Sequence, residues 1–110
     1  MSNATSHVGP IIFGHPVARA QLETHGEVVT FRTADRTTGA TWWRETRTGP
    51  KRGDCTVECL GALDESFPLD QLPNEYVELS GFDSAAAWDD AITDVNGSRT
   101  DGYLYRVTER

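Results

Sequence analysis

Arginine and tryptophan gather in one stretch of a chain that is otherwise acidic. Its 110 residues include 17 acidic and 10 basic side chains, for a formal net charge of −7. Six of the ten basic residues lie between Thr30 and Arg52, where only two acidic residues oppose them, so this stretch carries +4. It also holds Trp42 and Trp43, two of the three tryptophans. Guanidinium groups beside aromatic rings are typical of nucleotide and single-strand recognition, so residues 30–52 are the first candidate for a binding site.

Two kinds of side chain in this stretch could hold a ligand. An arginine such as Arg32 grips a phosphate or carboxylate through two N–H groups, and a tryptophan stacks on a base with about 1–3 kcal/mol. Both have an ordinary alternative, because Arg32 could pair with an acidic residue and both tryptophans could be core or rim residues. Six cations neutralise few phosphates, so a small nucleotide or modified base fits better than a long strand. The candidate ligand-binding residues are Thr30, Arg32, Trp42, Trp43, Arg44, Arg47, Lys51 and Arg52.

Thr30 is the one candidate for catalysis. A threonine hydroxyl needs an adjacent base or an electropositive partner to act as a nucleophile. Glu27 is close in sequence, but alternation along a strand points it to the opposite face. The alternative is an ordinary strand residue whose hydroxyl bonds locally. The sequence contains no dinucleotide-binding glycine motif, P-loop or pair of CxxC motifs, so no cofactor is expected.

Length and charge bound the remaining possibilities. A chain of 110 residues forms one domain, here residues 10–110 behind a flexible polar tail at 1–9. Between Asp54 and Asp94 there are eleven acidic residues and no basic one. Such a composition, with arginine in place of lysine, is typical of salt-adapted proteins, and a protein contact around Asp89–Asp94 is the alternative explanation. The pI near 4.8 argues against binding nucleic acid through overall charge.

Compartment and metal use follow from what the sequence lacks. It has no run of 18 apolar residues and no signal peptide at its start, so we expect a cytoplasmic monomer that does not enter membranes. Cys55 and Cys59 would lie about 13 Å apart on one face of a strand, too far for a disulfide, and are expected to be small buried residues. The three histidines show no ligand spacing with these cysteines, so no metal is expected.

Two strands must position the candidate residues. Residues 27–33 are rich in β-branched side chains, and alternation turns Val29 and Phe31 toward the core and leaves Thr30 and Arg32 together on a polar surface. The strand predicted at residues 41–46 carries the tryptophan pair. Adjacent strand residues face opposite ways, so one tryptophan is expected on the arginine-bearing face of that strand.

The remaining elements complete a small mixed fold. Further strands are predicted at 10–13, 55–60 and 103–108, helices at 15–25, 74–79 and from Ser84 to Asn96, and turns or loops at 47–53 and 61–71. This order predicts an α+β fold, with a small, strongly bent mixed sheet or barrel of about five strands flanked by two or three helices.

Periodicity predicts which side chains the core takes up. Alternation over residues 55–60 turns Cys55 and Cys59 inward. The last helix repeats apolar residues at helical spacing, the pattern of a core-facing stripe, while its three aspartates face solvent. That stripe is Ala85, Trp88, Ile92 and Val95.

Four short motifs follow one another in an order that resembles a known family. They are T-x-R at Thr30–Arg32 after a helix that ends near glycine, Gly53–Asp54 at the opening of a strand, Ser80–Ser84 with Trp88 in the next helix, and the closing strand Tyr103–Val107. Over about residues 10–108 this pattern resembles the ASCH domain of the PUA-like superfamily. The resemblance implies a PUA-like β-barrel with flanking helices and a cleft that binds RNA or nucleotides.

The chain departs from that family at two positions. Some ASCH relatives are amidohydrolases that deacylate modified cytidine with a lysine, a threonine and a carboxylate. The threonine matches Thr30, but Glu27 stands at the lysine position and Ser80 stands about where the carboxylate is expected. The resemblance therefore favours an RNA- or nucleotide-binding module built on residues 30–52. The alternatives are a hydrolase acting on a modified nucleoside and a non-catalytic protein-interaction domain.

Overall fold

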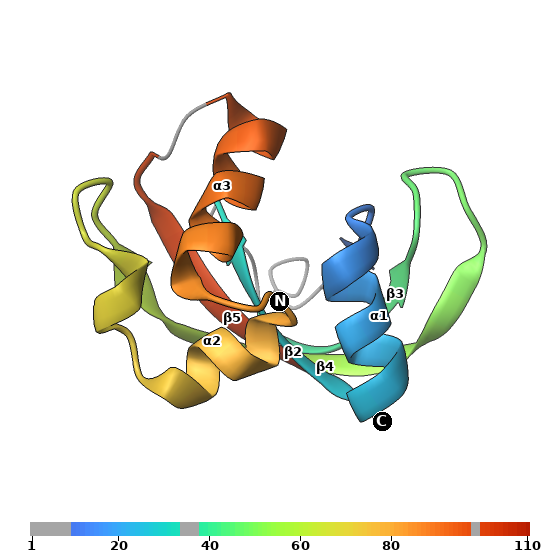
Figure 1. Ribbon diagram of the computed structural model, residues 1–110. Coiled ribbons are helices and arrows are strands. Elements are labelled where there is room, and N and C mark those ends of the chain that lie inside the picture. Colours follow the sequence, from blue (N-terminus) through green and yellow to red (C-terminus); the bar gives the residue numbers. More distant parts are fainter. Residues whose placement is uncertain (1–9, 34–37, 98–99) are drawn as a thin grey trace, which may run out of the picture.

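Five strands form one curled mixed sheet within residues 10–33, 38–97 and 100–110, the part of the chain that the computed structural model describes (Figure 1). Their order across the sheet is β1-β3-β4-β5-β2, with β1 parallel to β3 and the other neighbouring pairs antiparallel. β1 and β2 are therefore the two edges of the sheet. The strands are β1 (Ile11–Ile12), β2 (Glu27–Arg32), β3 (Gly39–Arg44), β4 (Lys51–Leu63) and β5 (Gly102–Glu109).

Three α-helices accompany the strands in the described ranges, and Figure 1 shows α1 and α3 on opposite sides of the view. They are α1 (Pro16–His25), α2 (Asn74–Ser80) and α3 (Ala85–Asn96), with a short 3-10 turn η2 (Leu69–Gln71) before α2. The predicted α+β fold of about five strands with flanking helices is thus confirmed. The predicted tail at residues 1–9 lies outside the described residues.

Local capping explains where the helices begin and end. The His15 side chain accepts a hydrogen bond from the Val17 backbone N–H at 3.2 Å, and Pro16 fills the first helical position of α1, where its missing N–H costs nothing. Gly26 ends α1 in the left-handed conformation at φ 74°. Ser84 caps α3 by accepting from the Ala87 N–H at 3.1 Å. These boundaries match those predicted from the sequence.

The sheet is covered on both faces, which gives the protein two cores. One core lies inside the curl and joins β1 and α1 to the sheet, whereas the other lies between the opposite face and α2, α3 and η2. Because both faces of β2 and β5 are buried, adjacent residues such as Val28 and Val29 are both core residues, in different cores. The inner core contains Ile11, Phe13, Leu22, Val28, Trp43, Cys55, Val57, Tyr105 and Val107. The outer core contains Val29, Phe31, Leu63, Leu69, Trp88, Ile92 and Leu104.

The two adjacent tryptophans of β3 face opposite ways, as alternation predicts. Trp43 is buried in the inner core at 1% exposure. Trp42 is half-buried on the other face, and the Arg44 guanidinium lies 5.2 Å from the centre of its ring. The tryptophan on the arginine-bearing face is therefore Trp42.

Four predictions about β4 and α3 are wrong. β4 begins at Lys51 and continues to Leu63, so it includes the end of the turn predicted at 47–53 and the start of the loop predicted at 61–71. Cys59 is exposed, because β3 pairs with β4 only as far as Val57 and the register shifts after Cys59, which leaves this side chain outside the inner core. Val95 is 67% exposed, because it lies almost one helical turn beyond Ile92, the last residue of α3 in the outer core.

Gly102 is a position where the packing admits no side chain. A Cβ added there would lie 2.6 Å from the Arg32 carbonyl oxygen and would overlap the Phe31 ring. We expect Gly102→Ala to lower the free energy of unfolding by about 1–3 kcal/mol, measured by urea denaturation. Gly14→Ala is the control, because its Cβ would approach nothing closer than 3.7 Å. Equal stability of the two variants would contradict this packing.

Candidate functional site

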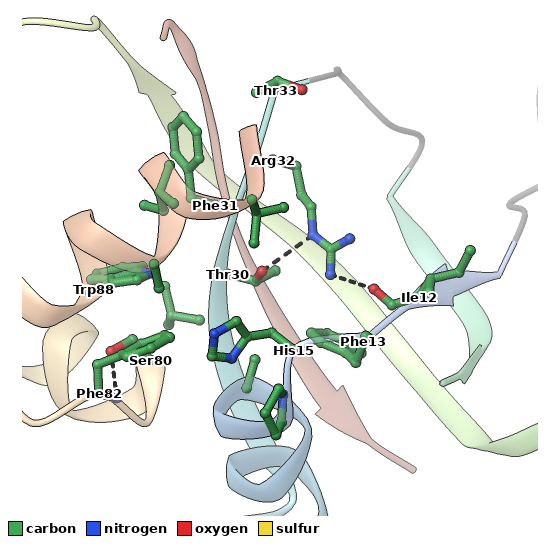
Figure 2. A pocket seen from close by; sticks show the side chains of 17 residues that line it. Ile12, Phe13, His15, Thr30, Phe31, Arg32, Thr33, Ser80, Phe82 and Trp88 are labelled. Atoms are coloured by element: carbon green, nitrogen blue, oxygen red, sulfur yellow. Dashed lines mark hydrogen bonds between the residues drawn. The ribbon is translucent and has the colours of Figure 1, made fainter. Parts of the chain in front are cut away.

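A pocket of about 660 Å³ opens between the edge strand β2, the segment that joins β1 to α1, and helix α3 (Figure 2). Aromatic side chains form much of its wall, and polar side chains from three separate parts of the chain converge on it. The aromatic residues are Phe13, Phe31, Phe82 and Trp88, and the polar ones are His15, Thr30, Arg32, Thr33 and Ser80. Such a volume and mixture of side chains are typical of small-molecule sites.

Arg32 connects the two edges of the sheet inside this pocket. Its Nε donates a hydrogen bond to Thr30 Oγ1 at 3.2 Å, and its Nη2 donates to the Ile12 carbonyl oxygen at 2.8 Å (Figure 2). The guanidinium also lies 5.0 Å from the centre of the Phe13 ring, within the range of a cation–π interaction. One side chain of β2 thus holds the carbonyl of β1 across the gap between them.

Thr30 and Arg32 are neighbours, as their spacing on one strand predicts. The expectation that they lie on an exposed polar surface is wrong for Thr30, which is only 8% exposed. The reason is that β1 and α1 cover this face of β2 as part of the inner core. Thr30 therefore lies in the floor of the pocket.

His15 and Ser80 are pocket residues that the sequence analysis did not single out as binding residues. The His15 ring packs against Phe82, with ring centres 5.3 Å apart, and projects into the pocket (Figure 2). Ser80 is 1% exposed; its hydroxyl donates to the Val77 carbonyl at 2.5 Å and accepts from the Phe82 N–H at 3.2 Å. Both lie at helix ends, and the His-Pro pair before α1 is a capping signal that could have drawn attention to His15.

Among the lining residues that the structure describes there is one arginine, Arg32, and no aspartate or glutamate. Arg32 is partly buried and brings a permanent positive charge to this lining. A guanidinium can bind an anionic group of a ligand through two N–H groups.

Two cations of the basic stretch, Lys51 and Arg52, lie outside the pocket and are paired with carboxylates. Arg52 forms ion pairs with Glu23 and with Glu45, the latter at 3.1 Å. Lys51 lies 2.7 Å from Asp54, and its hydrogen bond is the main reason that the pKa of Asp54 falls below its ordinary value.

Only the first part of the predicted binding stretch contributes to the pocket. Thr30 and Arg32 line it, whereas Trp43 is in the inner core and Trp42 stacks with Arg44 on a different face of the sheet. The tryptophan in the pocket is Trp88, which the sequence analysis assigned to the core and which is also an outer-core residue. The remaining members of the set, Arg47, Lys51 and Arg52, are exposed and do not line the pocket.

No family model, curated protein or solved structure matches this chain. The resemblance to the ASCH domain therefore stays a prediction from short motifs.

In the described residues, no helix is long and apolar enough to cross a membrane. Nor do three or more His, Cys, Asp or Glu side chains in that part of the chain come together in a way that could hold a metal ion.

Of the three positions that the resemblance associates with hydrolysis, two line the pocket and one does not. Thr30 and Ser80 both line the pocket, although they lie 50 residues apart in the sequence. Glu27, at the lysine position, does not line it and forms an ion pair with Arg106 at 3.2 Å. The pocket thus holds a hydroxyl at two of these positions and lacks a charged group from the third.

The bridge made by Arg32 is expected to stabilise the fold. We expect Arg32→Met, which keeps most of the apolar stem, to lower the free energy of unfolding by about 1.5–3 kcal/mol, because hydrogen bonds from a charged donor contribute this much. Urea denaturation measures it. The matched control is Arg47→Met at an exposed arginine, for which we expect a change within about 0.5 kcal/mol. If Arg32→Met is as stable as the control, the bridge contributes nothing to folding.

Proposed function

We propose that this protein binds a nucleotide or a modified nucleobase in the pocket between β2 and α3. The observation that carries the proposal is the pocket itself: about 660 Å³, aromatic walls, a guanidinium on one side and no acidic side chain among the described lining residues. Pockets of about 300–1,000 Å³ with a few convergent polar groups commonly hold small ligands. A base could pack against the aromatic residues while its phosphate faces Arg32.

The charge distribution favours a small ligand over a long nucleic-acid strand. Arg32 is the one arginine or lysine among the described lining residues, and Arg52 and Lys51 are paired with carboxylates. Binding a long strand requires several cations along the path of its phosphates. RNA could still be a ligand if a single unstacked nucleotide of it enters the pocket.

The resemblance to the ASCH domain supports the same proposal. It implies a PUA-like barrel with a ligand cleft, and Thr30, which matches the family's threonine, lines this pocket. The curled five-stranded sheet is compatible with such a barrel. A cytoplasmic location, as predicted from the sequence, would suit a nucleotide ligand.

Binding is favoured over hydrolysis because the pocket lacks an evident base for Thr30. No described lining residue is a carboxylate or a lysine. His15 could accept a proton in principle, but its Nδ1 already accepts a hydrogen bond from Val17. The third alternative, a protein contact through Asp89–Asp94, has no structural observation beyond the exposure of Asp90 and Asp94.

Titration with 5′-mononucleotides, followed by amide and indole NMR signals, tests the proposal. We expect signals of Trp88, Thr30 and His15 to shift while the indole signal of Trp42 stays in place. Arg32→Lys should weaken binding about tenfold, because lysine keeps the charge but loses the bidentate donor geometry of the guanidinium. Arg47→Lys, which changes an exposed arginine in the same way, should leave the affinity unchanged. If mononucleotides and short RNAs leave the pocket signals unmoved at millimolar concentration, the proposal is wrong.

A further inference from the structure

The His15 ring presents a hydrogen-bond donor to the pocket. Its Nδ1 accepts from the Val17 backbone N–H at 3.2 Å, so Nδ1 carries no proton. A neutral imidazole then carries its proton on Nε2, which is a donor. Because Nδ1 is held at the start of α1 and the ring packs against Phe82, this donor has a fixed position.

Thr30 can supply a second donor. Its Oγ1 accepts from Arg32 Nε at 3.2 Å, so the hydroxyl hydrogen is directed away from the guanidinium. Ser80 differs, because its hydroxyl already donates to Val77 and accepts from Phe82. His15 and Thr30 are therefore the neutral side chains best placed to donate to a ligand, beside the charge of Arg32.

The backbone carbonyl oxygens on the same wall each already accept one hydrogen bond. The carbonyl oxygen of Ile12 accepts from Arg32, and those of Phe13 and Gly14 accept from Arg19 Nη1 at 3.3 and 3.2 Å. The next carbonyl, that of His15, accepts from the Arg19 backbone N–H at 3.1 Å. Among the described lining residues there is also no Asp, Glu, Asn or Gln side chain to serve as an acceptor.

We infer that the pocket selects bases that present carbonyl oxygens, of the uracil type, over bases that present an exocyclic amine, of the cytosine type. This inference rests on the proposed nucleotide-binding function and names the class of base. A carbonyl oxygen can accept from His15 Nε2, which cannot itself accept in this tautomer, whereas the Thr30 hydroxyl can donate or accept and does not discriminate between the two bases. An amine that faces His15 Nε2 would meet a donor, and at that position it would lose its hydrogen bond to water without replacement.

Matched nucleotides test the preference directly. Uridine and cytidine 5′-monophosphate share the phosphate and sugar, but they differ at the carbonyl O4 and the amine N4, and in whether N3 carries a proton. We expect uridine monophosphate to bind about tenfold more tightly by isothermal titration calorimetry, since an unmatched buried polar group weakens binding by roughly 5- to 150-fold. Inosine and adenosine monophosphate form a second pair with the same contrast in a purine, and they should show the same direction.

Two serine variants assign the preference to His15. His15→Ser keeps a good capping hydroxyl at the start of α1 but removes the Nε2 donor, whereas His25→Ser makes the same change at the exposed far end of the helix. The loss of packing on Phe82 weakens both nucleotides alike, so the ratio of their affinities is the quantity to compare. We expect this ratio to fall toward one in His15→Ser and to stay unchanged in His25→Ser, with little change in Tm for either.

The outcomes separate this inference from the proposed function. If mononucleotides bind at the pocket but uridine and cytidine monophosphate bind equally, or the cytidine compound binds more tightly, the inference is wrong and the proposed function stands. If His15→Ser keeps the full preference, His15 is not its source and the inference is overturned. If no mononucleotide moves the pocket signals, both fail.

Discussion

The hydrogen bond from Arg32 to the Ile12 carbonyl is the link on which the closure of the sheet depends. β1 has only two residues, it pairs with β3 on one side, and it forms no backbone ladder with β2 on the other. A guanidinium on a long stem spans that gap and brings a charged donor to the partly buried Ile12 carbonyl. The edges are thus joined by a side chain instead of by strand pairing, and the space that this leaves is the pocket.

The two cores explain how β2 is held in place without a hydrogen-bonded strand on its β1 side. β2 is an edge strand, but its faces are fixed independently: Val28 packs inside the curl and Val29 packs under α3. Burial of both sets of side chains specifies the register of β2 against β5, since a slip of one residue would exchange them between the cores. The strand that carries Thr30 and Arg32 is therefore rigid even where it has no neighbour in the sheet, which suits a preformed site.

Much of the fold could be predicted because its signals are local. Alternation distinguished the two faces of β3, and glycine and serine marked the helix ends. What could not be predicted depends on partners distant in sequence. The register shift after Cys59 arises from how β4 meets β5, and the length of β4 arises from its pairing with β3 at its start and with β5 at its end. Both are properties of the assembled sheet, so the strand pattern alone predicted neither.

The site was only partly predictable for a related reason. Thr30 and Arg32 were found because two residues on one strand face are neighbours in any fold. The apparent positive stretch was misleading, because folding brings Glu23 of α1 to Arg52, almost 30 residues away. His15 was overlooked, and Ser80 was noted only as a departure from the family pattern, because each also has a structural role at a helix end that accounts for its presence without reference to a ligand.

The exposure of Val95 has a consequence for how the protein can diverge. Val95 lines the pocket but belongs to neither core, and its side chain is 67% exposed. Substitutions at such a position change the shape of the pocket entrance at little cost in stability, whereas substitutions at Trp88 disturb the outer core as well. Descendants of this sequence could therefore acquire new ligand preferences through the last turn of α3 while the residues that hold the fold stay the same.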